Sequence, residues 1–202
     1  MGSINALPSL TEETEWEMKP AYYLVDYLVA NHREFREVDL PAMELIMDGT
    51  DIPVYPDWFV IKLISQEFRY FQEEFLKHMA EEESFLFPKI LHNEACYRFK
   101  DLPPEVYKGS VNLFFRHNRH TPEAEFKRMF TSIREKLMNQ ALQDSTKVMT
   151  KQVIDGLESF ERRLFHHADL ESNVLFPMAG HLEQELYESI VPGLSQFPNN
   201  LK

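Results

Sequence analysis

Two stretches of this sequence place a histidine and a glutamate at the same spacing in front of the same three residues. One reads LKHMAEEESFLFPKI and the other FHHADLESNVLFPMA. The pairs are His78 with Glu82 and His167 with Glu171, and Leu-Phe-Pro follows each glutamate at the same distance. Residues four apart lie on one face of a helix. Each pair therefore offers an imidazole and a carboxylate together, a combination that binds iron, zinc or manganese.

Both pairs interrupt a hydrophobic seam with the spacing of a packed helix. An unpaired carboxylate in such a seam is disfavoured by several kcal/mol, and a bound cation removes that penalty. The pattern therefore predicts metal ligands in a helical core. The apolar positions are Ile61, Ile64, Phe68, Phe71, Phe75 and Phe85 around the first pair, and Val153, Leu157, Phe160, Leu164, Val174 and Met178 around the second.

A less specific interpretation is a helix-end ion pair, because His-x-x-x-Glu also arises by chance. His181 and Glu185 have the same spacing but no Leu-Phe-Pro after them. We expect that pair to lie on the surface. A single pair elsewhere would be interpreted in the same way, but two pairs in identical register favour a metal site.

Other helices should complete the ligand set. His32 lies on one face with Val25, Leu28, Val29 and Phe35, which predicts an inward-pointing imidazole. Further on, His117 and His120 are both candidates, since Pro122 interrupts that segment and shifts its helical phase. His166 points away from the seam and His92 lies in a predicted connection, so neither is expected to be a ligand.

The elements that position these residues are four long helices with short connections. They predict an all-α fold, an antiparallel up-down-up-down four-helix bundle. Residues 1–17 are expected to be a flexible leader, 18–190 the bundle and 191–202 a tail. The predicted helices span about 20–48, 56–87 (ended by Pro88), 105–140 (with Pro122 inside), 148–176 (ended by Pro177) and a short 181–190, with a connection over 92–105.

Composition narrows the class of protein. The net charge is −12 and the pI is about 5.1, which disfavours binding to nucleic acid or to an anionic membrane surface. Cys96 is the only cysteine, and no stretch has the length and hydrophobicity of a membrane span or a signal peptide. We therefore expect a cytoplasmic protein.

The chain resembles the haemerythrin-like (HHE cation-binding) domain family, and within it the di-iron proteins of the repair-of-iron-centres type. The resemblance covers roughly residues 22–180. It rests on HMAEEESFLFP, on HADLESNVLFP, and on His32 followed by Arg36-Glu37 and Leu40-Pro41. In the third helix Arg119-His120, with Ala124, Phe126 and Phe130 after it, fits the family pattern except that arginine replaces a glutamate. That fit favours His120 over His117.

The resemblance implies an oxo- or hydroxo-bridged pair of iron ions. Its ligands would be His32, His78, Glu82, His120, His167 and Glu171, with the two glutamates as bridges. An open position on iron in a Phe-rich interior would admit O2 or NO. The expected function is a non-haem di-iron protein that handles O2 or NO, or donates iron, in stress response or iron-centre repair. The alternatives are a di-iron oxidoreductase that consumes NO or peroxide, and a zinc-filled or metal-free structural bundle.

Overall fold

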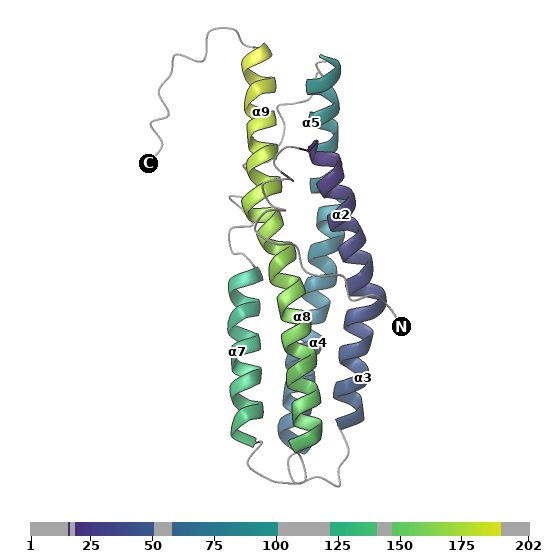
Figure 1. Cartoon of the computed structure of the whole chain (residues 1–202), viewed down its shortest axis with the longest axis vertical. Helices are drawn as coiled ribbons and strands as arrows, with labels where there is room; N and C mark the ends of the chain where they lie inside the picture. The colour runs from purple at the N-terminus through teal and green to yellow at the C-terminus, as the bar shows by residue number, and fades with distance from the viewer. Residues whose placement is uncertain (1–15, 17–18, 51–57, 101–121, 141–146, 191–202) are drawn as a thin grey trace, which may run out of the picture. The chain divides into compact units, whose positions relative to one another are not determined.

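The computed structural model describes Trp16 and residues 19–50, 58–100, 122–140 and 147–190, and within these ranges every regular element is a helix (Figure 1). The all-α prediction is confirmed for them, and the arrangement is consistent with a helical bundle. The described ranges contain four helical runs. The first contains α2 (Ala21–Glu34), η1 (Phe35–Asp39) and α3 (Leu40–Thr50); the second α4 (Trp58–Glu81), η2 (Glu82–Leu86) and α5 (Phe87–Phe99); the third α7 (Pro122–Gln140); the fourth α8 (Lys147–Leu170), η3 (Glu171–Leu175) and α9 (Phe176–Ile190).

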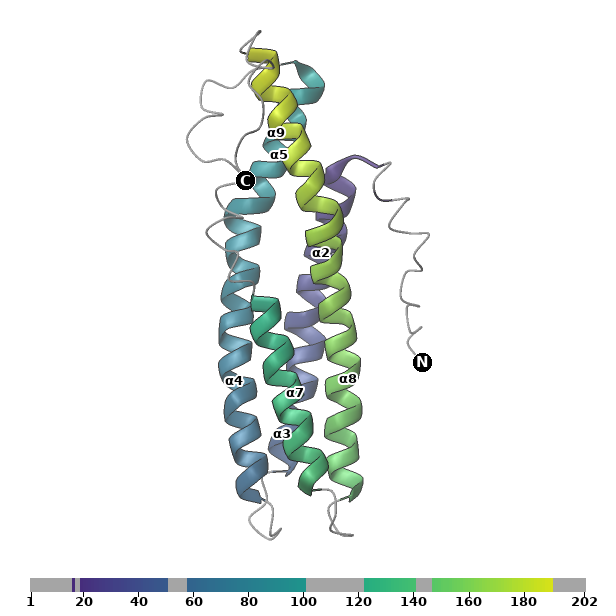
Figure 2. The ribbon, with the colours of Figure 1, turned by 90° about the vertical axis from the view of Figure 1, so that its left-hand side faces the viewer.

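The chain divides into two compact units. The first comprises Met1–Tyr27, Glu82–Arg119 and Asp169–Lys202, and the second comprises Leu28–Glu81 and His120–Ala168. Within the first unit, α5 packs against α9. Within the second, α4 contacts both α3 and α7, and Figures 1 and 2 show α8 running alongside them.

Aromatic side chains build the core of the second unit. The predicted seams are buried there, with Ile64, Phe68, Phe71 and Phe75 on α4 and Val153, Leu157, Phe160 and Leu164 on α8. Phe71 makes edge-to-face contacts with Phe126, Phe130 and Phe160, at ring-centroid distances of 4.6, 5.2 and 5.6 Å. Each buried phenylalanine contributes about 1.5–3 kcal/mol through burial, and each favourable ring pair about 0.5–1.5 kcal/mol more.

The prediction that prolines end the second and fourth helices is wrong. The helical runs continue past Pro88 to Phe99 and past Pro177 to Ile190. A π-helical segment precedes each proline, and in η3 the Phe176 N–H donates to the Glu171 carbonyl five residues back. This wider turn changes the register of backbone hydrogen bonds just before a residue that has no N–H and clashes with an ordinary α-helical turn. The helix therefore accommodates the proline and continues.

The π segments also shift the buried face by one position. Phe85, predicted to continue the seam, is 56% exposed, whereas Leu86 is 1% exposed. In the fourth run Met178 is only half-buried and Ala179 takes the interior position. A π turn accommodates one extra residue, so a fixed helical period fails beyond it.

Three other boundaries differ from expectation. Residues 92–99, predicted as a connection, belong to α5, and the short helix predicted over 181–190 is the continuation of a longer one. The first run extends to Thr50, two residues beyond the predicted end. Within the third predicted helix, the structure describes α7, which begins at Pro122. Proline is suited to the first turn of a helix.

A buried carboxylate fixes the start of α2 within the first unit. Glu94 of α5, which is 6% exposed, accepts hydrogen bonds from the backbone N–H groups of Ala21 (2.9 Å) and Tyr22 (3.0 Å). These are amides of the first helical turn, which have no partner within their own helix. Negative charge at a helix N-terminus is also favourable to the helix dipole. Glu94 therefore anchors α2 to α5.

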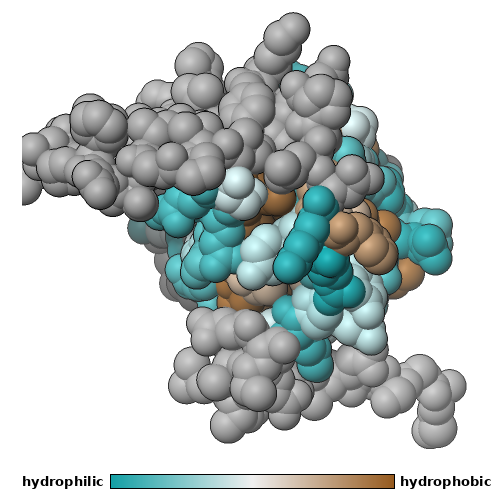
Figure 3. Space-filling view, turned by 90° about the horizontal axis from the view of Figure 1, so that it is seen from above, coloured by the Kyte–Doolittle hydropathy of each residue, from teal (hydrophilic) through white to brown (hydrophobic). Residues whose placement is uncertain are grey.

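On the surface, apolar side chains do not gather into one area in the view that Figure 3 gives. There, brown hydrophobic side chains lie in small areas among teal hydrophilic ones. The exposed apolar residues of α5 include Tyr97 and Phe99. Glu185 of α9 accepts a hydrogen bond from Tyr97, which raises the pKa of that phenol. Among the described helices, none combines the length and apolarity that crossing a bilayer requires.

Candidate metal centre

Four buried side chains from the three longest helical runs form a group with the chemistry of a metal site. We call His32, Glu82, His167 and Glu171 the His/Glu group. Each offers one ligand atom, and these atoms all lie within 4.8 Å of one another. Exposed fractions are 0% for His32, 2% for Glu82, 3% for His167 and 4% for Glu171. The group is therefore withdrawn from water, and its donors are two imidazole nitrogens and two carboxylate oxygens.

The imidazoles of the group face each other directly. The Nε2 atoms of His32 on α2 and His167 on α8 are 3.0 Å apart, and their ring centroids are 4.7 Å apart. Nitrogens that bind one metal ion at about 2.0–2.1 Å and at right angles to each other stand about 3 Å apart. The spacing therefore suits two neighbouring ligands of one ion as well as an N–H···N hydrogen bond.

The carboxylates occupy equivalent places in their helices. Glu82 is the first residue of η2, and Glu171 is the first residue of η3. Of the glutamates beside Glu82, Glu81 is exposed and Glu83 is half-buried. Two buried carboxylates close together repel each other and lose hydration, at a cost of several kcal/mol each. A cation offsets both penalties, so the donor set fits a metal ion.

The other two residues predicted as ligands, His78 and His120, are not among the four of the His/Glu group. His78, four residues before Glu82, is half-buried and is not part of the His/Glu group. His120 and its competitor His117 lie outside the described residues, so that choice stays a prediction. Phe126 and Phe130, two of the residues whose spacing favoured His120, are buried.

The histidines expected to be non-ligands lie outside the group. His181 has a 73% exposed side chain 3.5 Å from Glu185, which agrees with the predicted surface pair. His92 belongs to α5, with its Nε2 atom 3.7 Å from the Cys96 sulfur. His166 is half-buried.

An aromatic ring lies against the imidazole of His167. Phe35, the first residue of η1, is 2% exposed and meets that imidazole edge-on, at a centroid distance of 5.6 Å and an interplanar angle of 86°. Its ring also contacts Phe75 at 5.3 Å and Phe160 at 5.8 Å. The aromatic core therefore extends to the imidazole of His167.

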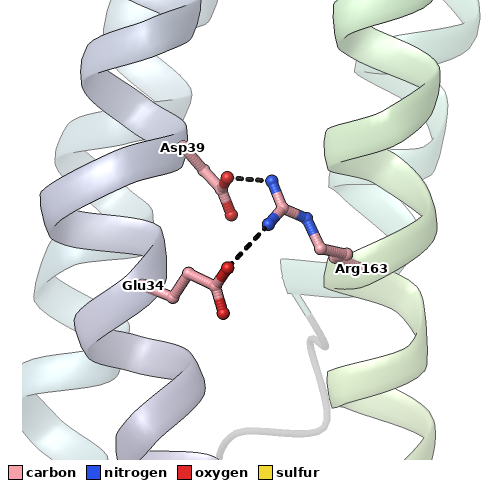
Figure 4. A network of polar contacts seen from close by, with 3 residues as sticks. All are labelled: Glu34, Asp39 and Arg163. Carbon is pink, nitrogen blue, oxygen red and sulfur yellow. Dashed lines mark hydrogen bonds and ion pairs between the residues drawn. The ribbon is translucent and has the colours of Figure 1, made fainter. Parts of the chain in front are cut away.

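A salt-bridge network, not anticipated from the sequence, joins the segments that carry the two imidazoles (Figure 4). Arg163 on α8 lies one turn before His167. Its guanidinium pairs with the buried carboxylate of Asp39 in η1 and, at 3.2 Å, with the more exposed Glu34 at the end of α2. Asp39 is 4% exposed, so Arg163 neutralises a charge that the core would otherwise disfavour. One feature of the sequence pointed to Asp39: it directly precedes Leu40-Pro41, in a segment whose apolar residues follow the period of a packed helix.

Comparison with known proteins finds distant relatives named for iron-sulfur cluster repair. The chain is 24% identical over 169 residues to the iron-sulfur cluster repair protein YtfE of Escherichia coli O1:K1 / APEC, a match that covers 83% of this chain and 70% of that protein. The proteins of that name from Escherichia coli strain SMS-3-5 and from Escherichia fergusonii match to the same extent. No protein-family model matches, and no solved structure matches. The chain is thus a distant homologue of an iron-sulfur cluster repair protein and carries a buried His/Glu group compatible with metal binding.

Proposed function

We propose that this protein is a haemerythrin-like non-haem di-iron protein that handles O2 or NO, or donates iron, in the repair of iron centres under stress. The observation that carries the proposal is the buried His/Glu group, whose charge and spacing call for a cation. The distant likeness to a protein named for iron-sulfur cluster repair supports iron as that cation. The proposal includes the up-down-up-down bundle and a cytoplasmic location.

The proposed ligand set is larger than the His/Glu group. His32, Glu82, His167 and Glu171 supply four donors, and a second ion requires His78 and the third-helix histidine, His120. Neutral imidazoles and two carboxylates would leave a pair of di- or trivalent ions with residual positive charge, which additional oxygen donors such as oxo or hydroxo would neutralise. When bound, the iron pair supplies reversible coordination of a diatomic molecule and exchange of an electron with it.

The surrounding residues would select what reaches the metal. Phe35 places an apolar ring beside His167, so neutral diatomic molecules are favoured over water and anions on that side. Arg163 fixes the helical segments from which His32 and His167 project. Both features act on binding and positioning, which are the tasks of a ligand-handling or iron-donating protein.

The test is to load the purified protein with Fe²⁺ in the absence of oxygen, remove unbound metal, and measure iron per chain before and after exposure to air or NO. We expect about two irons per chain and near-ultraviolet charge-transfer bands after oxidation. Glu83→Gln, next to the proposed ligand Glu82, is the matched control and should bind iron normally. Glu82→Gln and His167→Ala should each lose iron. A protein that binds zinc and rejects iron, or whose iron content survives both changes, would refute the proposal. Sustained turnover of NO or peroxide would identify the oxidoreductase alternative.

A further inference from the structure

The three π-helical segments in the part of the chain that the structure describes share one local design. Each begins six residues before a proline: Phe35 before Pro41 in η1, Glu82 before Pro88 in η2, and Glu171 before Pro177 in η3. In η1 and η3 the N–H of the residue after the segment donates to the carbonyl of its first residue, from Leu40 to Phe35 and from Phe176 to Glu171. The first run therefore carries a third copy of the device that positions the two buried glutamates.

Burial is the same in all three copies. The first and fifth residues of every π segment are buried: Phe35 and Asp39 in η1, Glu82 and Leu86 in η2, Glu171 and Leu175 in η3. Equivalent helical positions thus point into the protein in each run.

The chemistry at these positions is inverted in the first copy. In η2 and η3 a glutamate comes first and a leucine fifth, whereas in η1 the aromatic Phe35 comes first and the carboxylate of Asp39 fifth. The carboxylate in η1 is neutralised by the guanidinium of Arg163, a cation that the protein itself supplies. The position that bears a candidate metal ligand in the other two runs is filled by a ring that meets His167 edge-on.

We propose that Phe35 is the specificity-determining residue of the metal centre. It occupies the place of a third carboxylate, limits the buried glutamates of the group to two, and leaves that side of the metal to a small neutral ligand rather than to an anion. A carboxylate there would add a negative charge and a competing oxygen donor. The ring instead excludes water and disfavours anions, because it offers no hydrogen-bond donor to replace the hydration that an anion loses there. This inference rests on the proposed function, since it concerns the same metal.

The direct test converts the first copy into the pattern of the other two. Phe35→Glu adds the carboxylate, and the double variant Phe35→Glu/Asp39→Leu does so while keeping one buried carboxylate in η1. Co²⁺ is the metal probe, and the readout is the rise in thermal midpoint between chelated and Co²⁺-loaded protein. Both variants should be less stable than the wild type when chelated. Both should gain more from Co²⁺ than the wild type does, because the ion neutralises the added charge.

Ligand selectivity gives a second, independent readout. Azide and NO are titrated into the iron-loaded proteins, and azide affinity should fall by about tenfold or more in both glutamate variants, since like charges at contact distance repel strongly away from bulk water. Phe35→Leu, which should fold in any case, opens the apolar wall and should raise azide affinity relative to NO. Phe71→Leu, a core change of the same size without a ring contact to His167, is the control and should leave that ratio unchanged.

The outcomes separate the inference from the function on which it rests. A wild-type protein that binds neither Co²⁺ nor iron would overturn the proposed function. A wild type that binds metal, with the same Co²⁺-induced shift and the same azide-to-NO ratio in all Phe35 variants, would overturn the role of Phe35 alone. An altered ratio in Phe71→Leu equal to that in Phe35→Leu would also overturn it, because general loosening of the core would then explain both.

Discussion

Removal of the Arg163 guanidinium should destabilise the protein far more than an ordinary surface substitution. Arg163 is the ionic partner of Asp39, whose side chain is 3% exposed, and Arg163 itself is 37% exposed. Loss of one partner of a fully buried pair costs about 3–5 kcal/mol. Partial exposure of the guanidinium reduces the expected cost of Arg163→Ala to about 2–3 kcal/mol, because water already screens part of the interaction. The contact with Glu34, half exposed at 50%, adds about 1 kcal/mol or less.

Urea unfolding of the chelated protein, followed by circular dichroism, measures this effect. The expected order of destabilisation is Arg163→Ala, then Asp39→Asn, then Glu34→Ala. Asp39→Asn should partly rescue Arg163→Ala, by about 1 kcal/mol or more, because it removes the uncompensated buried charge. Arg134→Ala breaks another ion pair to α8, at Glu161, and serves as the matched control with a cost of about 1 kcal/mol.

Metal affinity provides a second readout for the same variants. Because Arg163 and Asp39 join the segments that carry His167 and His32, Arg163→Ala should weaken Co²⁺ binding, and Arg163→Lys should restore part of it. Arg134→Ala should not change it. An Arg163→Ala protein within about 0.5 kcal/mol of the wild type, the range of ordinary surface substitutions, would refute the reasoning. So would the absence of any rescue by Asp39→Asn.

Further predictions concern other carboxylates. Glu171→Gln should stabilise the chelated protein, since it removes a buried charge, yet should reduce the gain in thermal midpoint on metal loading; Glu83→Gln should change neither. Glu94→Gln should cost about 1–2 kcal/mol by weakening the cap of α2, and hydrogen exchange of the first α2 amides should accelerate. Glu185→Gln should lower the pKa of Tyr97 toward its ordinary value, seen by ultraviolet titration. The raised pKa means that this hydrogen bond stabilises the fold below pH about 10 and that its contribution is lost as the phenol ionises.

Much of the fold follows from spacing alone. The positions of Phe68, Phe71 and Phe75 on α4, and of Leu157 and Phe160 on α8, obey one helical period and are buried as predicted. The inward direction of Glu82 and Glu171 also follows, since both continue those seams up to the first residue of a π segment. Local periodicity is reliable over these stretches because tertiary packing and helical geometry impose the same pattern.

Beyond those glutamates the periodic argument fails for a physical reason. A π turn advances the chain by one extra residue, so Leu86 replaces Phe85 on the buried face. The prediction that proline ends each helix fails because a wider turn before the proline lets the helix continue. The sequence did carry a signal for these wider turns: Leu-Phe-Pro occurs twice, and Pro41 follows Leu40 in a third run. The pairing of Asp39 with Arg163 depends on a contact between residues 124 positions apart, which no local pattern encodes.

Anomalous diffraction at the iron absorption edge, from crystals of iron-loaded protein, tests the central claim most directly. The account predicts a strong peak within bonding distance of the Nε2 atoms of His32 and His167 and of carboxylate oxygens of Glu82 and Glu171, and a second peak beside His78. A peak only at surface carboxylates, or none near these four side chains, would contradict it.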